Sequence, residues 1–145
     1  MNKFTILIPV YNDWESLKKL LNTINENIQD ISNTEFNCVI VNDSSTENRP
    51  KIKVPPKIAS IKIIHMKKNR GHARCNAFGI KYLSKSSDVG HVILMDGDGE
   101  DRPEELKLLV DKVLSEPDIS VVAKRVKRSE GLLFQTLYHI HKYLT

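Results

Sequence analysis

The chain has 145 residues, of which 40% are hydrophobic, and a formal net charge of +4. This length suits one domain with a core of its own, and no apolar run is long enough to span a membrane. The first apolar stretch, residues 4–10, is too short for a signal peptide, so we expect a cytoplasmic protein. Cys38 and Cys75 lack metal-ligand spacing and are expected to be buried thiols. The net charge is mild, and we expect no nucleic-acid partner, although basic residues gather after Val121 where they could meet an anionic lipid or a phosphate.

The first half of the chain alternates apolar runs with amphipathic segments. Residues 4–10, 36–42 and 60–66 are short and β-rich and predict three strands. After the first strand, Asn12 or Asp13 can cap a helix. The buried side of this helix is expected to carry Leu17, Leu20, Leu21 and Ile24.

The second half continues the alternation. Residues 91–96 and 119–124 predict two more strands, and residues 69–83, 102–114 and 132–144 predict helices. Pro103 suits a first helical turn. The expected apolar stripes are Ala73, Ala77, Ile80 and Leu83 or Tyr82 in the first of these helices; Leu106, Leu109, Val110 and Val113 in the second; and Leu133, Leu137, Ile140 and Leu144 in the third.

Apolar strands that alternate with helices predict an α/β fold, with a mostly parallel sheet covered by helices on both faces. Polar groups follow three of the expected strands, at residues 11–13, 42–44 and 96–98. Ligands of such sheets bind at the carboxyl ends of the strands. We therefore expect these three segments to meet at one edge and to form the functional site.

The stretch "MDGDGEDRPEEL" ends a strand in acids rather than in apolar residues. Carboxylates such as Asp96 and Asp98 are the oxygen ligands that Mg²⁺ or Mn²⁺ prefers, and such ions often bridge protein and diphosphate. An EF-hand is excluded, because its sixth position would be Asp101 and its twelfth Lys107. Gly-rich phosphate-binding loops are also absent from the sequence, and a phosphate-receiving signalling domain is a weaker alternative.

Four segments in this order, "ILIPVYND", "VIVNDSSTE", "NRGHARCNAFGI" and "ILMDGDGEDRPEEL", resemble the nucleotide-binding half of family 2 glycosyltransferases with the Rossmann-like GT-A fold. The subgroup that they resemble is the polyprenyl-phosphate glycosyltransferases, which include dolichol-phosphate mannose synthase. The resemblance covers roughly residues 4–128. It implies transfer of a sugar from a UDP- or GDP-sugar to a lipid-phosphate or saccharide acceptor, with Mg²⁺ or Mn²⁺ as cofactor, in the building of cell-envelope glycans.

The resemblance also implies roles for individual residues. Asp43 matches a carboxylate that accepts a hydrogen bond from the base edge, and Arg70 and Arg74 are candidates for the diphosphate. The implied nucleotide-binding residues are Pro9, Tyr11, Asn12, Asp43, Arg70, Arg74 and Asp96. The implied metal ligands are Asp96, Asp98 and Glu100, and the implied contacts to the acceptor phosphate are Arg125 and Arg128.

The resemblance leaves the acceptor side open. It implies a nucleotide-sugar domain over residues 1–128 and the start of an acceptor region, with an amphipathic helix, over residues 129–145. No general base is identified, so a non-catalytic or shortened nucleotide-sugar-binding module is the alternative function. The expected partners are a nucleotide sugar and a lipid phosphate, which would place the protein against the inner face of the membrane. The sequence predicts neither the sugar nor the oligomeric state.

Overall fold

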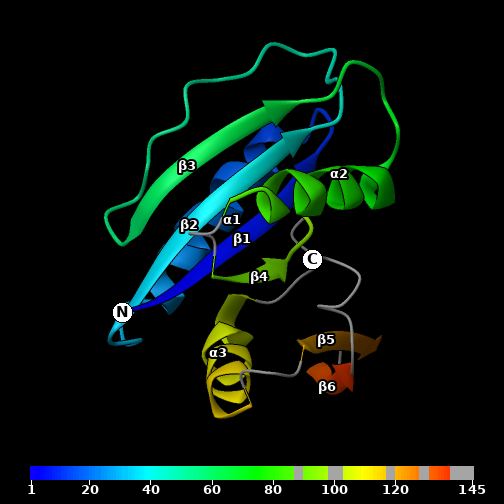
Figure 1. Ribbon diagram of the computed structural model, residues 1–145. Helices are drawn as coiled ribbons and strands as arrows, with labels where there is room; N and C mark the ends of the chain where they lie inside the picture. Colours follow the sequence, from blue (N-terminus) through cyan, green and yellow to red (C-terminus); the bar gives the residue numbers. More distant parts are fainter. Residues whose placement is uncertain (87–89, 98–102, 117–119, 128–130, 138–145) are drawn as a thin grey trace.

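The computed structural model describes residues 1–86, 90–97, 103–116, 120–127 and 131–137 (Figure 1). Strands and helices alternate over most of this length, as the hydrophobic pattern predicts. The elements in chain order are β1 Asn2–Val10, α1 Trp14–Asn27, β2 Thr34–Asn42, β3 Ile58–His65, α2 His72–Ser84, β4 His91–Leu94, the 3₁₀ turn η1 Pro103–Glu105, α3 Leu106–Ser115, β5 Ser120–Lys127 and β6 Gly131–Leu137.

The main sheet has four strands in the order β3-β2-β1-β4, and every neighbouring pair is parallel. At the carboxyl ends, Val10 of β1 lies opposite Asn42 of β2, which in turn lies opposite His65 of β3. The ladder extends past β4, because the Met95 N–H donates to the Leu7 carbonyl at 3.0 Å. The carboxyl ends of these strands therefore share one edge of the sheet, as predicted.

Helices cover both faces of this sheet, which confirms the predicted α/β architecture (Figure 1). Alternate residues of β1 are buried on opposite faces of the sheet, because successive side chains of a strand point to opposite sides. Phe4, Ile6 and Ile8 join the larger core cluster, which includes α1 and α3. Leu7 joins the second cluster, which includes α2. Both faces of the central strand are thus sealed from water.

The predicted apolar stripes of α1 and α3 are confirmed residue by residue. The stripe of α2 was predicted wrongly at two positions, since Ala73 and Ala77 are exposed. The buried residues of this helix are Cys75, Gly79 and Leu83. Gly79 sits so close to β1 that an added Cβ would lie 2.5 Å from a methyl carbon of Leu7. The helix therefore turns its smallest residue, rather than its alanines, toward the sheet.

The predicted strand at residues 119–124 exists as β5, but it lies outside the main sheet. It pairs with β6 in an antiparallel two-stranded sheet. The helix predicted for residues 132–144 is wrong for residues 132–137, which belong to β6; residues 138–144 lie outside the described residues. A continuous apolar run such as Leu132 to Phe134 fits a strand as well as a helix, so its periodicity cannot separate the two.

In the part of the chain that the structure describes, no helix combines the length and apolarity needed to cross a bilayer.

Candidate functional site

Three polar loops follow the carboxyl ends of the parallel strands and form the candidate site. The loop after β1 begins with Tyr11 and Asn12, and the loop after β2 begins with Asp43. The segment after β4 carries Asp96. Figure 1 shows that β2 and β3 point toward the end of the molecule where α2 begins. The first residues of α2 therefore join the same edge.

Asn12 ties the first loop to the second. Its backbone is left-handed, with φ of 57°, a conformation that asparagine tolerates better than most residues. Its side-chain oxygen accepts hydrogen bonds from the N–H groups of Thr46 and Glu47, at 2.8 and 2.9 Å. Its side-chain nitrogen donates to the Thr46 hydroxyl, and its backbone N–H donates to the Ser45 hydroxyl, each at 2.9 Å. The Asn12 amide thus fixes the path of the loop after β2.

Asn12 does not cap α1 with its side chain. The N-cap residue of α1 is Asp13, and its side chain makes no capping hydrogen bond. The predicted capping interaction is therefore wrong for Asn12, because its side chain is engaged by the neighbouring loop instead.

Asp43 is buried, with an exposed fraction of 1%. One oxygen of its carboxylate accepts the N–H of Arg70 at 2.7 Å, and the other accepts the N–H of Gly71 at 2.9 Å. The Asn69 side chain donates to the backbone carbonyl of Asp43 at 3.2 Å. Both carboxylate oxygens are thus bound to the turn that leads into α2.

Cys75 lies in the first turn of α2, and its side chain is hydrogen-bonded to Asp43. Burial raises the pKa of the Cys75 thiol to about 12, and the hydrogen bond to the Asp43 carboxylate and its negative charge act in the same direction. Burial alone raises the pKa of Cys38 to about 12. Both cysteines are free and buried, as the sequence predicts. Neither thiol is suited to act as a nucleophile near neutral pH.

Asp96 lies at the same edge, beside the start of α2. Its Oδ1 atom is 4.0 Å from Nδ1 of His72, and both side chains are 45% exposed. Gly97 follows, and an added Cβ there would lie 3.2 Å from the carbonyl oxygen of Pro9. The segment after β4 therefore runs against the end of β1 and leaves Asp96 partly open to solvent.

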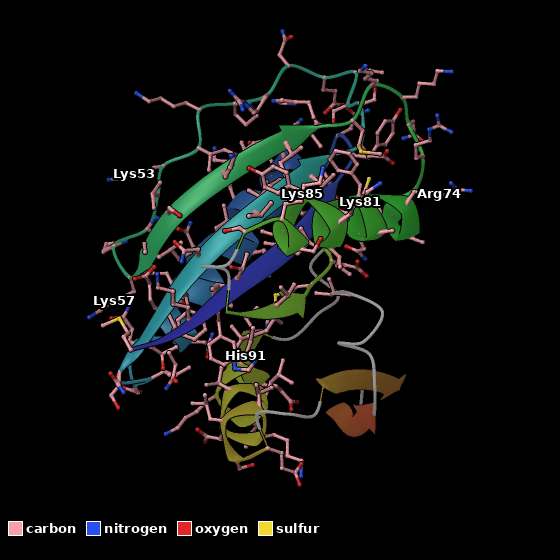
Figure 2. All side chains as sticks on the ribbon, viewed as in Figure 1. Lys53, Lys57, Arg74, Lys81, Lys85 and His91 are labelled. Atoms are coloured by element: carbon pink, nitrogen blue, oxygen red, sulfur yellow. The ribbon has the colours of Figure 1, made fainter. Side chains whose placement is uncertain are left out.

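The other predicted residues take different positions. Arg70 and Arg74 are exposed, and Figure 2 shows Arg74 near the end of α2 that faces the loop after β3. Pro9 is buried in β1, whereas Tyr11 is 40% exposed. Arg125 lies in β5.

Three of the predicted site residues, Asp98, Glu100 and Arg128, lie outside the described residues. Within the described ranges, no three His, Cys, Asp or Glu side chains lie close enough to hold a metal ion. Of the predicted metal ligands, the structure thus places only Asp96.

His72 is a residue at this edge that sequence reasoning missed. A histidine after an Asn-x-Gly turn carries no recognisable motif by itself, and only the fold brings it next to Asp96. The available signal was its position, since it is the first residue of a helix that follows a parallel strand. Such helix starts lie at the ligand-binding edge of these sheets.

The chain is similar to known proteins over most of its length. The family model described as Glycosyl transferase family 2 matches residues 5–144. An undecaprenyl-phosphate 4-deoxy-4-formamido-L-arabinose transferase of Proteus mirabilis is 28% identical over 136 residues, which is 93% of this chain and 40% of that protein. A dolichol-phosphate mannosyltransferase of Pyrococcus furiosus is 27% identical over 126 residues, covering 86% of this chain and 34% of that protein. The chain therefore spans well under half the length of these relatives.

Solved structures show the same fold. A mannosyltransferase of Pyrobaculum calidifontis in complex with GDP-Man and Mn²⁺ superimposes with a TM-score of 0.61 at 19% identity, over 88% of this chain and 36% of that one. S. aureus TarS 1–349 in complex with UDP gives a TM-score of 0.57 at 24% identity, over 81% of this chain and 34% of that one. The fold of the described residues is that of GT-A glycosyltransferases.

Proposed function

Because this chain belongs to glycosyl transferase family 2, we propose that it binds a nucleotide sugar at the carboxyl edge of its parallel sheet and serves sugar transfer to a lipid phosphate. One observation carries the proposal: Asp96 lies 4.0 Å from His72, at the start of a helix whose preceding turn is bound to Asp43. Elements far apart in the chain thus converge on one partly open acidic position. This arrangement suits a diphosphate bound through a cation.

We assign the nucleotide to the loops at this edge. Pro9, Tyr11 and Asn12 line the side of β1 in this assignment, and Asn12 also holds the loop after β2. Arg70 and Arg74 are exposed near the start of α2, where a guanidinium can donate two parallel hydrogen bonds to phosphate oxygens. UDP and GDP are both candidates, since the names of two structural neighbours include one or the other.

Asp96 is the residue that we assign to a divalent cation, together with Asp98 and Glu100. Its carboxylate is half exposed, and an imidazole nitrogen lies near it. Carboxylate oxygens are the donors that suit Mg²⁺ or Mn²⁺. When bound, the ion would neutralise the diphosphate and stabilise it as a leaving group.

The acceptor that we propose is a polyprenyl phosphate at the inner face of the membrane, since two relatives are named for such acceptors. An oxygen of the acceptor phosphate forms a bond to the anomeric carbon of the sugar. The bond from that carbon to the nucleoside diphosphate breaks, and its electron pair leaves with the diphosphate. An acceptor that is already an ionised phosphate has no hydroxyl proton to lose, so a general base is less needed. Arg125 and Arg128 are the proposed contacts to this phosphate.

Calorimetric titration tests the proposed site. We expect UDP or GDP to bind in the presence of Mn²⁺ and to bind much more weakly without it. Asp96→Asn should remove the metal dependence, because it removes a charged ligand. Lys112→Gln, which changes a charged residue on α3 that pairs with Glu116, is the control and should bind as the unaltered protein does. Equal affinity with and without metal, or no binding of either nucleotide, would contradict the proposal.

A product assay then separates an enzyme from a binding module. The assay uses UDP-glucose or GDP-mannose with a polyprenyl phosphate and Mn²⁺. Formation of a glycosylated lipid phosphate supports transfer by this chain. Metal-dependent binding without product would instead support the non-catalytic alternative.

A further inference from the structure

Basic side chains are concentrated in one stretch of this chain. Residues 48–87 contain 11 of the 22 lysines and arginines and no aspartate or glutamate, so all 18 acids lie in the rest of the chain. Every one of these 11 cations is exposed. The stretch comprises the loop before β3, β3 itself, the next loop and α2. The mild net charge is thus the balance of a basic segment and an acidic remainder, and such segregation favours an anionic partner.

The solvent-exposed face of α2 carries part of this charge in a narrow stripe. Arg74, Phe78, Lys81 and Lys85 follow one another at intervals of four, three and four residues, so they lie on one side of the helix and its C-cap. All four are exposed, and the exposed fraction of Phe78 is 41%. Figure 2 shows the three cations spread along the length of α2.

A fourth cation extends this stripe onto the sheet. The Nζ atom of Lys62, in β3, lies 4.9 Å from the centre of the Tyr82 ring. Tyr82 belongs to α2 and packs against the second core cluster, so Lys62 lies beside the helix on the same face of the sheet. We call the following five residues the α2 patch: Lys62, Arg74, Phe78, Lys81 and Lys85.

Contacts within the chain do not account for the charge of the α2 patch. Among the described residues, its lysines and its arginine form no ion pair. Lys81 and Lys85 are four residues apart, and like charges at this spacing destabilise a helix. The helix dipole favours both lysines at the C-terminal end but opposes Arg74 in the first turn. An anionic partner would relieve both repulsions.

The exposed phenylalanine indicates which anionic partner fits. Phe78 lies one turn after Arg74 and one turn before Lys81, so cations flank its ring. An aromatic ring gains free energy when it moves from water into the interfacial layer of a bilayer. The flexible stems of lysines let their ammonium groups reach lipid phosphates while a neighbouring apolar side chain penetrates. An acidic polypeptide offers the same charge without an apolar layer.

We propose that the α2 patch docks this domain on an anionic bilayer, with Phe78 in the interfacial layer and the four cations against lipid headgroups. The inference goes beyond the proposed sugar transfer, because it assigns a second surface that acts whatever reaction the site performs. It also differs from the sequence expectation, which brought the basic residues after Val121 to an anionic lipid. Arg74 is also assigned to the diphosphate, so the test leaves it unaltered.

Vesicle co-sedimentation tests the docking without nucleotide or acceptor. The whole chain is mixed with vesicles of phosphatidylcholine alone, or of equal parts phosphatidylcholine and phosphatidylglycerol. We expect binding only to the anionic vesicles, and weaker binding as salt screens the charges. Lys81→Glu/Lys85→Glu should lower the partition coefficient roughly tenfold or more, since one cation near an anionic surface contributes a factor of about five.

Lys18→Glu/Lys19→Glu is the matched control. It makes the same change of net charge on α1, which covers the opposite face of the sheet. This variant should bind anionic vesicles almost as tightly as the unaltered protein. Phe78→Ser should weaken binding and keep its salt dependence. Melting temperatures check that each variant is folded, and Lys81→Gln/Lys85→Gln replaces the charge reversal if that variant is not.

Three results would overturn the inference. Absence of binding to anionic vesicles would refute docking. Equal losses from the two double charge reversals would show that net charge, and not the α2 patch, attracts the lipid. Displacement from the vesicles by soluble polyglutamate, together with unchanged binding of Phe78→Ser, would make the patch a surface for an acidic protein. Nucleotide titrations are separate measurements, so failure of the proposed function would not be mistaken for any of these results.

Discussion

At the scale of single residues, the sequence shows which polar residues follow the strands, but it does not show their hydrogen-bond partners. Asn12 and Asp43 were both assigned to a nucleotide, and the structure shows each of them holding a neighbouring loop. Their donors come from residues 27 to 35 positions away in the chain. Such partners depend on tertiary geometry, so residue type and spacing cannot reveal them.

The buried thiol of Cys38 leads to a prediction about how stability depends on pH. The pKa of Cys38 is raised to about 12 in the folded protein because burial disfavours the thiolate. The unfolded chain loses this proton near pH 9, so the folded state binds more protons than the unfolded state above that pH. The thiol's contribution to stability is therefore complete below about pH 9 and is lost as the pH rises toward 12, at about 1.4 kcal/mol per pH unit.

Urea unfolding at several pH values between 8 and 10.5 measures this effect. We expect the free energy of unfolding of the unaltered protein to fall more steeply with pH than that of Cys38→Ala, since the variant lacks this proton. Cys75 and the other titrating groups are common to both proteins. If the free energy of unfolding depends on pH in the same way for both proteins, the pKa of Cys38 is not raised in the folded state.

At the scale of elements, the buried face of a helix was predicted correctly where large apolar side chains form that face. The leucine and valine stripes of α1 and α3 were predictable, because large apolar side chains favour burial. The contact of α2 depends on Gly79, whose lack of a side chain gives no hydrophobic signal. The β5–β6 hairpin was missed because three consecutive apolar residues, Leu132 to Phe134, have no period.

Gly79→Ala tests the close contact between α2 and β1. The new Cβ would lie 2.5 Å from a methyl carbon of Leu7, which is fully buried and has little room to move. Overpacking of this kind costs about 1–3 kcal/mol, and the better helix propensity of alanine returns about 1 kcal/mol. We expect a net loss of up to about 2 kcal/mol in the free energy of unfolding.

A double-mutant cycle identifies the cause. In a Leu7→Ala background the space is open, so the same change at Gly79 should cost less or should stabilise the protein. Chemical denaturation of the four proteins measures the coupling. If Gly79→Ala costs the same in both backgrounds, α2 and β1 are not in close contact at this position.

At the scale of the whole molecule, the sequence predicted the parallel sheet and the edge at which ligands should bind. Both follow from rules that hold for the entire fold: strands that alternate with helices pair in parallel, and parallel strands bring their carboxyl ends together. The sequence did not predict His72 as a neighbour of Asp96, because that distance depends on where α2 begins. The turn before α2 is hydrogen-bonded to Asp43, a contact that becomes visible only in the structure.

The central claim is that the edge around Asp96 binds a nucleoside diphosphate through a divalent cation. Paramagnetic broadening by Mn²⁺ tests it most directly: amide signals are recorded in a nuclear magnetic resonance titration with UDP or GDP present. The account predicts that the signals of Gly71, His72 and Asp96 broaden first, while Thr34, at the opposite end of β2, stays sharp. Broadening centred elsewhere, with the His72 and Asp96 signals unaffected, would contradict it.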